Sequence, residues 1–453
     1  MVFWWQFFVN FGVALAFTLR YLRTVVSIFA YLLFKPYPIA EHPQYTSEDV
    51  TVIVPTTFKT PVELLQCFQS INECSPTHIF VVTADGNVRL VRELCALNSI
   101  KNVSVLGVAK LNKRNQMLMA VDQVKTEIIV FADDDVFWPE NFLNHLLAIF
   151  EDPYVGAGGA RQRVRRNPSP NIFNFLGIGY LERRVWNNIT TNAIDGSIST
   201  LSGRTAAYRT EILKNDEFSY YFLNDKWLGK PLNTDDDKCL TRYVYSHGWK
   251  IAIQTSTMIE TTLEDNWGYV DQCMGWTRGH WRGNLTVMTN ESYWRSIRYA
   301  WGAYVIYLGQ LQTPALLVDG FLFYLLHLAL VDLSATARMW AFIAFGVWIF
   351  FTKSLKTIPH YIRHPADMRF IPISVLFSYV HGVFNVYALF TLGTTVWGSQ
   401  KLEQLEKPKA ETDDERIPLL RNTMAEISNQ EPRPGNVTVG EDYVSPPSTA
   451  PEP

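Results

Sequence analysis

The chain has 453 residues, of which 48% are hydrophobic, 14% aromatic and only 18% charged, with a formal net charge of −3 at pH 7. This composition excludes an intrinsically disordered chain, because such chains are poor in aromatic residues, and the net charge offers no general attraction for nucleic acid, so no nucleic-acid partner is expected. The five cysteines form no CxxC pair, which argues against a disulfide scaffold or a structural zinc site.

Residues 1–35 are predicted to be a membrane anchor. Val2–Leu19 carries no charge and as a helix would be about 27 Å long, close to the hydrocarbon thickness of a bilayer. Arg20 and Arg23 follow it, whereas a cleaved signal peptide carries its positive charge before the apolar run. We therefore expect a retained anchor with both arginines on the cytosolic side. The alternative is a buried or interfacial amphipathic helix.

Residues 48–265 are predicted to form an α/β domain, because short β-branched segments alternate with helical ones. Thr60 is expected to cap the first helix, with Pro61 in its first position and Glu63 completing a capping box. No GxGxxG motif follows the first strand, so the alternation predicts a parallel sheet with ligands at its carboxyl edge rather than a dinucleotide site. The predicted strands are Val50–Pro55, His78–Thr83, Val103–Val108 and Glu127–Ala132, and Val88–Leu97 is a predicted helix.

Polar residues that suit ligand binding follow these strands. Asp133 and Asp135 are two apart at a strand end, so we expect them to share a face and to suit Mg²⁺ or Mn²⁺ held jointly with a diphosphate. The alternative is a solvated acidic turn. Asp85 can accept hydrogen bonds from a base or ribose, and Lys113 and Arg114 can bind phosphates. The alternative for these three is a turn or a helix surface.

Asp235, Asp236 and Asp237 open a helical pattern that Gly248 can end. The helix dipole stabilises ionised carboxylates in a first turn, and an ionised carboxylate can act as a general base toward a sugar hydroxyl. The alternative is simple N-capping.

The segment 266–298 is predicted to form interfacial helices. Its stretch Gln272–Arg282 combines cations with indole faces, which pack against sugar rings, while arginine forks grip phosphate. An amphipathic helix at headgroup depth is the alternative, and the two interpretations are compatible.

Residues 299–400 are predicted to be a membrane region, with three or four spans in the whole chain and some segments lying in the interface. Asp319 and His327 either face a polar cavity, or Asp319 marks a turn between two shorter segments. Residues 401–453 are rich in proline and charge and are predicted to be a disordered tail. The apolar segments are Tyr299–Val318, Gly320–Val331, Met339–Thr352 and Phe370–Gln400.

An ordered set of motifs along the chain resembles that of membrane-embedded family 2 glycosyltransferases. The motifs are, in order, VTVIVP, Asp85, Lys113-Arg114, the Asp133–Asp135 run, Leu201–Gly203, the Asp235–Asp237 run and the Gln272–Trp276 motif. The chain is most similar to hyaluronan synthases and fungal capsule-type polysaccharide synthases. The resemblance runs from about residue 48 to 400 and includes Thr395–Gln400. It implies an α/β GT-A (Rossmann-like) catalytic domain flanked by transmembrane and interfacial α-helices.

For the donor, the resemblance implies a UDP-sugar. Asp85 would contact the uridine, and Lys113 and Arg114 the nucleotide. Asp133 and Asp135 would hold Mg²⁺ or Mn²⁺ and the diphosphate, so that the metal stabilises the leaving UDP.

For the acceptor, the resemblance implies that Ser202 and Gly203 lie on a nearby loop. Asp237, supported by Asp236, would be the base of an inverting transfer, and Trp276 would pack against the acceptor sugar. The sequence does not distinguish among UDP-glucose, UDP-GlcNAc and UDP-glucuronate. A run of arginines either favours an acidic donor or polymer or forms a solvated face: Arg161, Arg163, Arg165 and Arg166.

The expected function is a processive inverting hexosyltransferase that extends a cell-wall or capsular polysaccharide from a cytosolic UDP-sugar and exports it. It would be a multi-pass protein of the plasma membrane, in contact with lipids, with its catalytic domain in the cytosol. The sequons at Asn188 and Asn284 would then stay unmodified. A lipid glycosyltransferase that adds one sugar is the first alternative, and a non-catalytic membrane scaffold is the second.

One motif departs from the family pattern. The family has QxxRW, whose arginine grips the donor diphosphate, but here Gln272 and Trp276 flank Gly275 at the arginine position. Arg278 is three residues beyond Gly275 and Arg282 seven, so both lie near the same helix face. We expect Arg278 to replace the missing guanidinium, with Arg282 second. The alternative is that both meet lipid headgroups.

Overall fold

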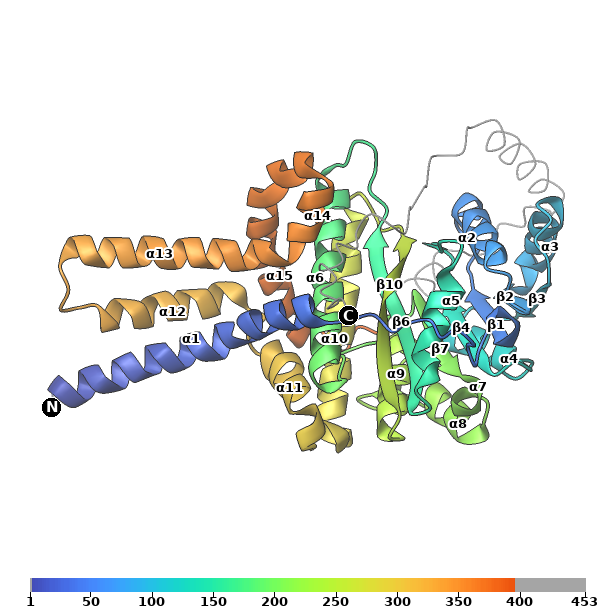
Figure 1. Cartoon of the computed structure of the whole chain (residues 1–453), viewed down its shortest axis with the longest axis horizontal. Helices are drawn as coiled ribbons and strands as arrows, with labels where there is room; N and C mark the ends of the chain where they lie inside the picture. The colour runs from blue at the N-terminus through green and yellow to red at the C-terminus, as the bar shows by residue number, and fades with distance from the viewer. Residues whose placement is uncertain (1, 396–453) are drawn as a thin grey trace, which may run out of the picture.

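In the computed structural model, which describes residues 2–395, a sheet covered by helices lies at one end and long apolar helices project from the other (Figure 1). Val396–Gln400 and the predicted tail 401–453 lie outside the described residues. The helices of the sheet domain and its border are α2 (Pro61–Glu73), α3 (Val88–Leu97), α4 (Lys113–Val121), α5 (Phe142–Leu147), α6 (Ile172–Asp195), α7 (Thr210–Leu213), α8 (Asp216–Leu223), α9 (Asp236–Ser246) and α10 (Gly268–Asn290). The remaining helices are α1 (Val2–Leu33), α11 (Ala300–Gly302), α12 (Ala315–Ala329), α13 (Ala335–Ser354), α14 (Ile358–Arg363) and α15 (Ile371–Phe390).

Within the described residues, the main sheet has eight strands in the order β3-β2-β1-β4-β7-β6-β10-β5. Its strands are β1 (Val50–Pro55), β2 (His78–Ala84), β3 (Val103–Val108), β4 (Ile128–Ala132), β5 (Val136–Phe137), β6 (Val155–Val164), β7 (Thr205–Arg209) and β10 (Lys250–Thr261). A small hairpin joins β8 (Lys226–Trp227) to β9 (Lys230–Pro231). The four predicted strands are confirmed to within one residue at each end.

The sheet is mixed, so the prediction of a parallel sheet is wrong for one half of it. β1 pairs parallel with β2 and β4, but β7 runs antiparallel to both β4 and β6, and β5 antiparallel to β10. Alternation of strands and helices carries no information on strand direction. Because of this reversal, β7 starts at the edge of the sheet where β4 ends. The residues just before β7 therefore lie next to those just after β4, and the Asp133 backbone N–H donates to the Arg204 carbonyl at 2.9 Å.

Both faces of the sheet are buried, as its β-branched strands predict. Val52 of β1 packs with α2, α3 and α5 on one face, whereas its neighbour Ile53 packs with α4, α8 and α9 on the other. The predicted apolar face of α2 is confirmed, since Leu64 and Phe68 are buried. The predicted capping box at Thr60 does not form. Thr60 lies at φ −125°, ψ 80°, outside the extended conformation of a capping residue, and its side chain accepts no capping bond from the described backbone.

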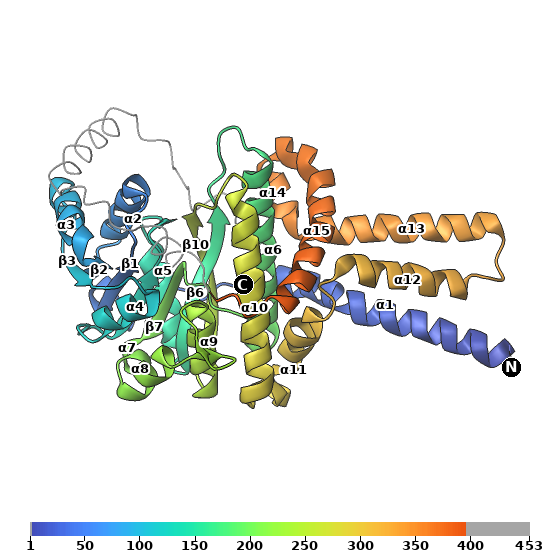
Figure 2. The ribbon, with the colours of Figure 1, turned by 180° about the vertical axis from the view of Figure 1, so that it is seen from behind.

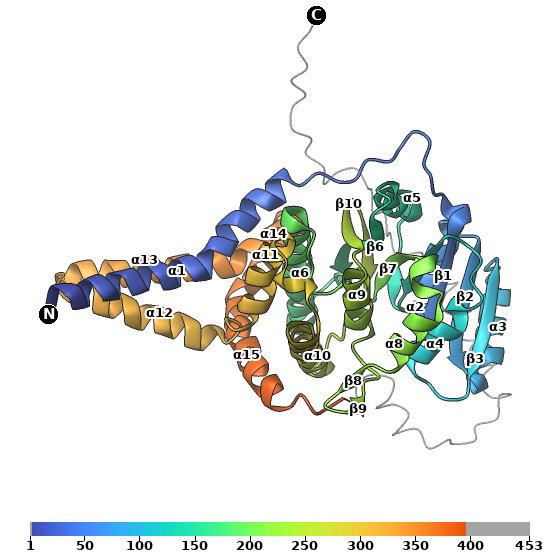
Figure 3. The same cartoon turned by 90° about the horizontal axis from the view of Figure 1, so that it is seen from below.

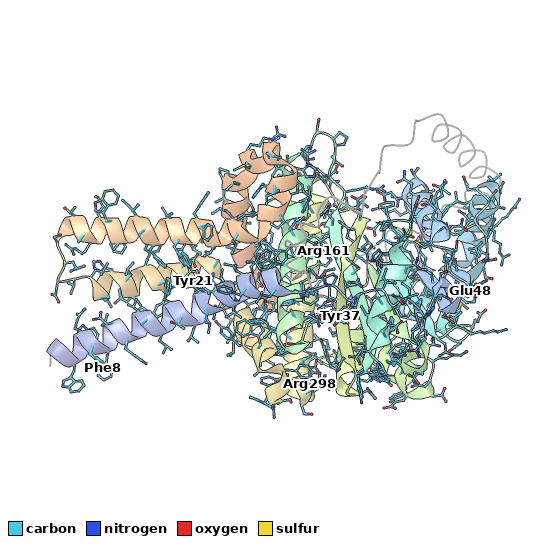
Figure 4. The ribbon with its side chains drawn as sticks, in the orientation of Figure 1. Phe8, Tyr21, Tyr37, Glu48, Arg161 and Arg298 are labelled. Atoms are coloured by element: carbon cyan, nitrogen blue, oxygen red, sulfur yellow. The ribbon has the colours of Figure 1, made fainter. Side chains whose placement is uncertain are left out.

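Three helical segments among the described residues are long and apolar enough to cross a membrane, in agreement with the expected three or four: Trp4–Leu33, Ala335–Arg363 and Pro365–Phe390. α1, α12 and α13 lie side by side and project away from the sheet, whereas α15 runs crosswise at their base (Figures 1 and 3). Phe8 lies on the projecting part of α1 and is 62% exposed, while Tyr21 is buried against Leu322 and Phe345 (Figure 4). The projection therefore presents apolar side chains outward, as a lipid-facing surface does.

Asp319 does not mark a turn. It lies inside α12, where its carboxylate forms ion pairs with Arg20 at 3.4 Å and Lys353 at 3.1 Å. Charged groups buried among apolar helices are expected to pair in this way. His327 is exposed, with its ring 6.4 Å from that of Phe342, and neither residue is among those that line the main cavity of the described chain.

The arginine run at the end of β6 and just beyond it is used in contacts between elements rather than as a solvated face. Arg166 makes a two-pronged bond to the buried Asp367, at 2.7 and 2.8 Å. Arg165 bonds to Gln66 at 2.8 Å, and Arg161 donates to the Tyr31 hydroxyl at 3.0 Å. These bonds connect the sheet domain to α1 and to the segment before α15.

Candidate active site

A cavity of about 720 Å³ lies between the sheet domain and the membrane helices. The helices α6 and α10 stand side by side at this border (Figure 2), and both contribute to its walls. Ten lysine and arginine side chains line the cavity, against four aspartates. This excess of positive charge suits an anionic ligand. The aspartates are Asp133, Asp235, Asp236 and Asp237.

Lys113 links the acidic residues of two different elements. It is the first residue of α4, whose capping residue is Asn112. Its ammonium lies 2.7 Å from Asp133 Oδ1 and 3.3 Å from Asp236 Oδ2. Burial alone would lower the pKa of Lys113, but Asp133 and Asp236 raise it above the ordinary value. Lys113 therefore stays charged and holds the two carboxylates together.

Gly203 lies directly beside this ion pair. A Cβ added at Gly203 would be 3.5 Å from Lys113 Nζ and 3.6 Å from Asp236 Oδ2. The reversed direction of β7 brings this loop, with the cavity-lining Ser202, to the end of β4. The structure thus brings together Lys113, Asp133, Ser202, Gly203, Asp236 and Asp237, as the sequence predicts.

Asp237 has the setting of a general base. It lies in the first turn of α9, whose capping residue Asp235 adopts the left-handed conformation at φ 60°. Its Oδ2 is 3.7 Å from an Arg184 nitrogen, and its Oδ1 accepts the Lys238 backbone N–H at 2.8 Å. Burial and the nearby Asp236 raise the pKa of Asp237 above its ordinary value. A raised pKa brings a carboxylate closer to the proton affinity that base catalysis at neutral pH needs.

The carboxylates that follow β4 form a crowded group in the turn before β5. Burial and the repulsion of Asp133 and Asp134 raise the pKa of Asp135 to about 8, while Asp134 accepts the Thr56 hydroxyl at 2.6 Å. A divalent cation would relieve this repulsion, and carboxylate oxygens are suitable ligands. Among the described residues, no group of three or more His, Cys, Asp or Glu side chains could hold a metal alone. The donor set therefore fits a cation whose remaining ligands come from a bound diphosphate.

Trp276 forms an aromatic wall of the cavity with Tyr180. Their rings stack at 4.9 Å with an interplanar angle of 17°, and the Arg204 guanidinium lies 5.4 Å from the indole. Arg278 also lines the cavity and donates to the Thr391 hydroxyl at 3.0 Å. Arg282, in contrast, is 3% exposed and forms an ion pair with Asp235. Within the described chain, Arg278 forms no ion pair with a carboxylate and Arg282 does.

Four predicted site residues do not line the cavity. One is Asp135, the second predicted metal ligand, whose carboxylate accepts the Thr261 hydroxyl at 3.4 Å. Asp85 is exposed and packs over Gly107. Arg114 is 1% exposed and donates to the Asp225 carboxylate at 3.0 Å, so it stabilises the interior beside the hairpin instead of facing a nucleotide. Gln272 accepts the Glu264 backbone N–H at 3.2 Å and holds the loop before α10.

Several residues that line the cavity could not be selected by sequence reasoning. Arg184 is the cation next to Asp237, and only its place on an amphipathic α6 could have indicated it. Lys238 is buried and donates to Ser199 and to the Asn284 side chain at 3.1 Å, and burial lowers its pKa to about 7. His280 is half-buried there, and desolvation and the nearby Lys238 lower its pKa.

Replacing Arg278 by Ala should lower kcat or raise the nucleotide-sugar KM at least tenfold, an effect of about 1.4 kcal/mol. The reason is that Gly275 supplies no cation, whereas Arg278 reaches the same cavity. Steady-state release of the nucleotide measures the effect, and Gly275→Arg should restore the activity of Arg278→Ala. Two results together would contradict this prediction: full activity of Arg278→Ala, and a steep rise in activity when Gly275→Arg is made alone. They would mean that the enzyme is weakened by Gly275 and that Arg278 does not replace the missing arginine.

Known proteins resemble this chain over most of its length. The family described as Glycosyltransferase like family 2 matches residues 47–279. A type 2 glycosyltransferase of Zymoseptoria tritici is 42% identical over 85% of this chain and 82% of that protein. The corresponding protein of Gibberella zeae is 39% identical over 84% of this chain and 74% of that protein. A hyaluronan synthase of Streptococcus pyogenes is 22% identical over 78% of this chain and 83% of that protein.

Among solved structures, the mannosyltransferase PcManGT from Pyrobaculum calidifontis, in complex with GDP-Man and Mn²⁺, is similar with a TM-score of 0.53. It shares 17% sequence identity, and the match covers 84% of this chain and 99% of that one, which is a likeness of fold. The sheet domain accordingly has the GT-A-like fold that the motifs imply. By its family match and its fungal relatives, the chain belongs to glycosyltransferase family 2 and is a glycosyltransferase.

Proposed function

We propose that this glycosyltransferase is a processive, inverting polysaccharide synthase that uses a cytosolic UDP-sugar. The observation that carries the proposal is a single cavity that holds the aspartates of a transfer site at one end and reaches the membrane helices at the other. An acceptor chain bound along it would have its reacting end at Asp237 and its other end directed to the membrane. The similarity to a hyaluronan synthase supports this assignment.

In the proposed reaction, the acceptor hydroxyl oxygen attacks the anomeric carbon and the bond from that carbon to the UDP oxygen breaks. Asp237 takes the hydroxyl proton, and Arg184 holds its carboxylate in place. Negative charge then grows on the leaving diphosphate, where Lys113 can stabilise it. Trp276 offers its face to the acceptor sugar.

Mg²⁺ or Mn²⁺ would be held by Asp133 and Asp135 together with the donor diphosphate. When bound, it supplies Lewis-acid stabilisation of the leaving group. Lys113, which now neutralises Asp133, would then be free to turn toward the diphosphate.

A lipid glycosyltransferase is the second candidate, because the cavity's cations extend to α1 and to the end of α13. Purified full-length protein in nanodiscs, given a panel of radiolabelled UDP-sugars, tests both candidates by the size of the product. A labelled polymer supports the synthase, and a lipid that carries one sugar supports the second candidate. Release of UDP from one sugar of the panel also identifies the donor. Family membership argues against the non-catalytic alternative.

We further propose a plasma-membrane location with the catalytic domain in the cytosol. Arg20 and Arg23 lie in the second half of α1 and line the catalytic cavity, which agrees with the rule that basic residues stay inside. Both sequons are in helices, and Asn284 is 1% exposed. Glycans sensitive to endoglycosidase at Asn188 or Asn284 would contradict this topology.

The rate of transfer should fall in acid with a midpoint above 3.9, the ordinary pKa of aspartate. Asp237 must be ionised to take a proton, and burial and Asp236 raise its pKa, so it becomes protonated at a higher pH than an exposed aspartate. Asp236→Asn should move the midpoint of kcat/KM against pH downward, because one source of repulsion is gone. If the midpoint did not change, a group other than Asp237 would control the fall of the rate in acid.

A further inference from the structure

At the membrane-facing end of the cavity, Arg20 is paired with Asp319, and three further cations come from three different elements. Arg23 comes from α1, Arg183 from α6, and Lys356 from the turn η7 (Leu355–Thr357) that follows α13. Lys356 lies within electrostatic reach of both Arg23 and Arg183. Arg183 bonds only to the Ser374 hydroxyl, at 3.4 Å, and Lys356 to the Asn187 side-chain oxygen, so among the described residues none of the three is paired with a carboxylate.

The acidic residues of the surrounding helices are already engaged. Asp319 pairs with Arg20 and Lys353, and Glu182 with Arg363. At the catalytic end the cavity aspartates are also engaged: Asp133 and Asp236 share Lys113, whereas Asp237 lies beside Arg184 and Asp235 binds Arg282. Holding like charges close together away from bulk water costs free energy unless an anion is bound between them. The three cations therefore need a negative ligand that the described part of the chain does not supply.

Two helices independently place these cations at the depth of lipid headgroups. The uncharged Val2–Leu19 spans about 27 Å before Arg20, and the 20 residues of α13 span about 30 Å before Lys356, each close to the hydrocarbon thickness. Val305, Ile306 and Ala315 line the same end of the cavity, so an alkyl chain has apolar neighbours there. A soluble acidic polymer would gain nothing from those neighbours.

We propose that Arg23, Arg183 and Lys356 bind the phosphate headgroup of a membrane lipid. Arginine and lysine are the usual partners of phosphate, and a phosphate monoester brings up to about two negative charges to the three cations. The inference deepens the proposed function by assigning a ligand to the membrane end of the same cavity. The phosphate belongs either to a lipid-linked acceptor or to a resident phospholipid, two sources with one headgroup chemistry.

The test measures binding without any sugar nucleotide, so that it can fail separately from the proposed function. Full-length protein in a neutral detergent is titrated with dihexanoyl phosphatidic acid and with dihexanoyl phosphatidylcholine, and binding is followed by tryptophan fluorescence. Phosphatidic acid should bind at least tenfold more tightly. The double variant Arg23→Gln/Lys356→Gln should lose at least tenfold of this affinity, while Arg23→Lys keeps most of it.

Arg338→Gln is the matched control, since Arg338 also lies on α13 but outside the cavity, and this variant should bind as the wild type does. The melting temperature without lipid shows whether each variant is folded. Equal binding of the two lipids, or unchanged binding by the folded double variant, would overturn the proposal. So would displacement of phosphatidic acid by an oligouronate, which would assign the cations to an acidic polymer.

A second assay separates the two lipid sources. Geranylgeranyl phosphate is added with the radiolabelled UDP-sugar that the protein accepts, and the lipid fraction is extracted. Label in that fraction identifies the bound lipid as an acceptor. Tight binding without label identifies a resident lipid, and both results support a phosphate-lipid site.

Discussion

Asp237→Asn should lower the rate of sugar transfer at least a hundredfold, within the range of 10²–10⁴ that a positioned general base contributes. Asparagine keeps the size of the side chain, so α9 and its contacts should persist, but its amide does not take the acceptor proton. Asp237 lies in the same cavity as Lys113, Gly203 and Trp276, where donor and acceptor would meet. Release of UDP over time, at saturating donor, measures the loss.

Asp216→Asn is the matched control for this variant. Asp216 also lies in the first turn of a helix, α8, but it is exposed and away from the cavity. Its substitution makes the same change in charge in the first turn of a helix, so the rate should stay within twofold. Unchanged UDP release by Asp237→Asn would exclude this residue as the base and direct attention to Asp236.

Local features of the fold could be predicted from the sequence, and pairings between distant segments could not. The bounds of α3 and β3 match the sequence-based ranges because their apolar periods and turn residues are local signals. The direction of β7 depends on how α6 returns the chain, and no local pattern encodes this. The position of Ser202 and Gly203 beside Asp133 agrees with the family resemblance, but its structural cause is this reversal.

The same reasoning explains the errors at the site. Lys113 and Arg114 are consecutive on α4 and point about 100° apart; Lys113 lines the cavity, whereas the Asp225 carboxylate holds Arg114 in the interior. Arg278 and Arg282 do share a helix face, as predicted, but Asp235, 47 residues earlier, captures Arg282. Such a pair between distant residues is invisible to spacing arguments within one helix.

This buried pair leads to the second prediction: Asp235→Asn should destabilise the protein by about 3 kcal/mol. Arg282 is 3% exposed, and its two bonds to the Asp235 carboxylate, at 2.8 and 3.2 Å, supply its only buried negative partner in the described chain. Without that charge, the guanidinium is left uncompensated in the interior. Asparagine tolerates the left-handed backbone at φ 60°, so the change isolates the charge from backbone strain.

The melting temperature, followed by tryptophan fluorescence, should fall by roughly 6 °C or more. Glu217→Ala is the control, because Glu217 forms an ion pair with His247 while 75% exposed, and such pairs contribute about 1 kcal/mol or less. Asp235 lies two residues before Asp237 and touches α10, where a Cβ at Gly279 would overlap its carboxylate. The pair therefore fixes the start of α9 against the helix that carries Trp276 and Arg278. If Asp235→Asn melted within 2 °C of the wild type, as the control is expected to do, Arg282 would have another anion, and the bound donor or a lipid phosphate would be the next to test.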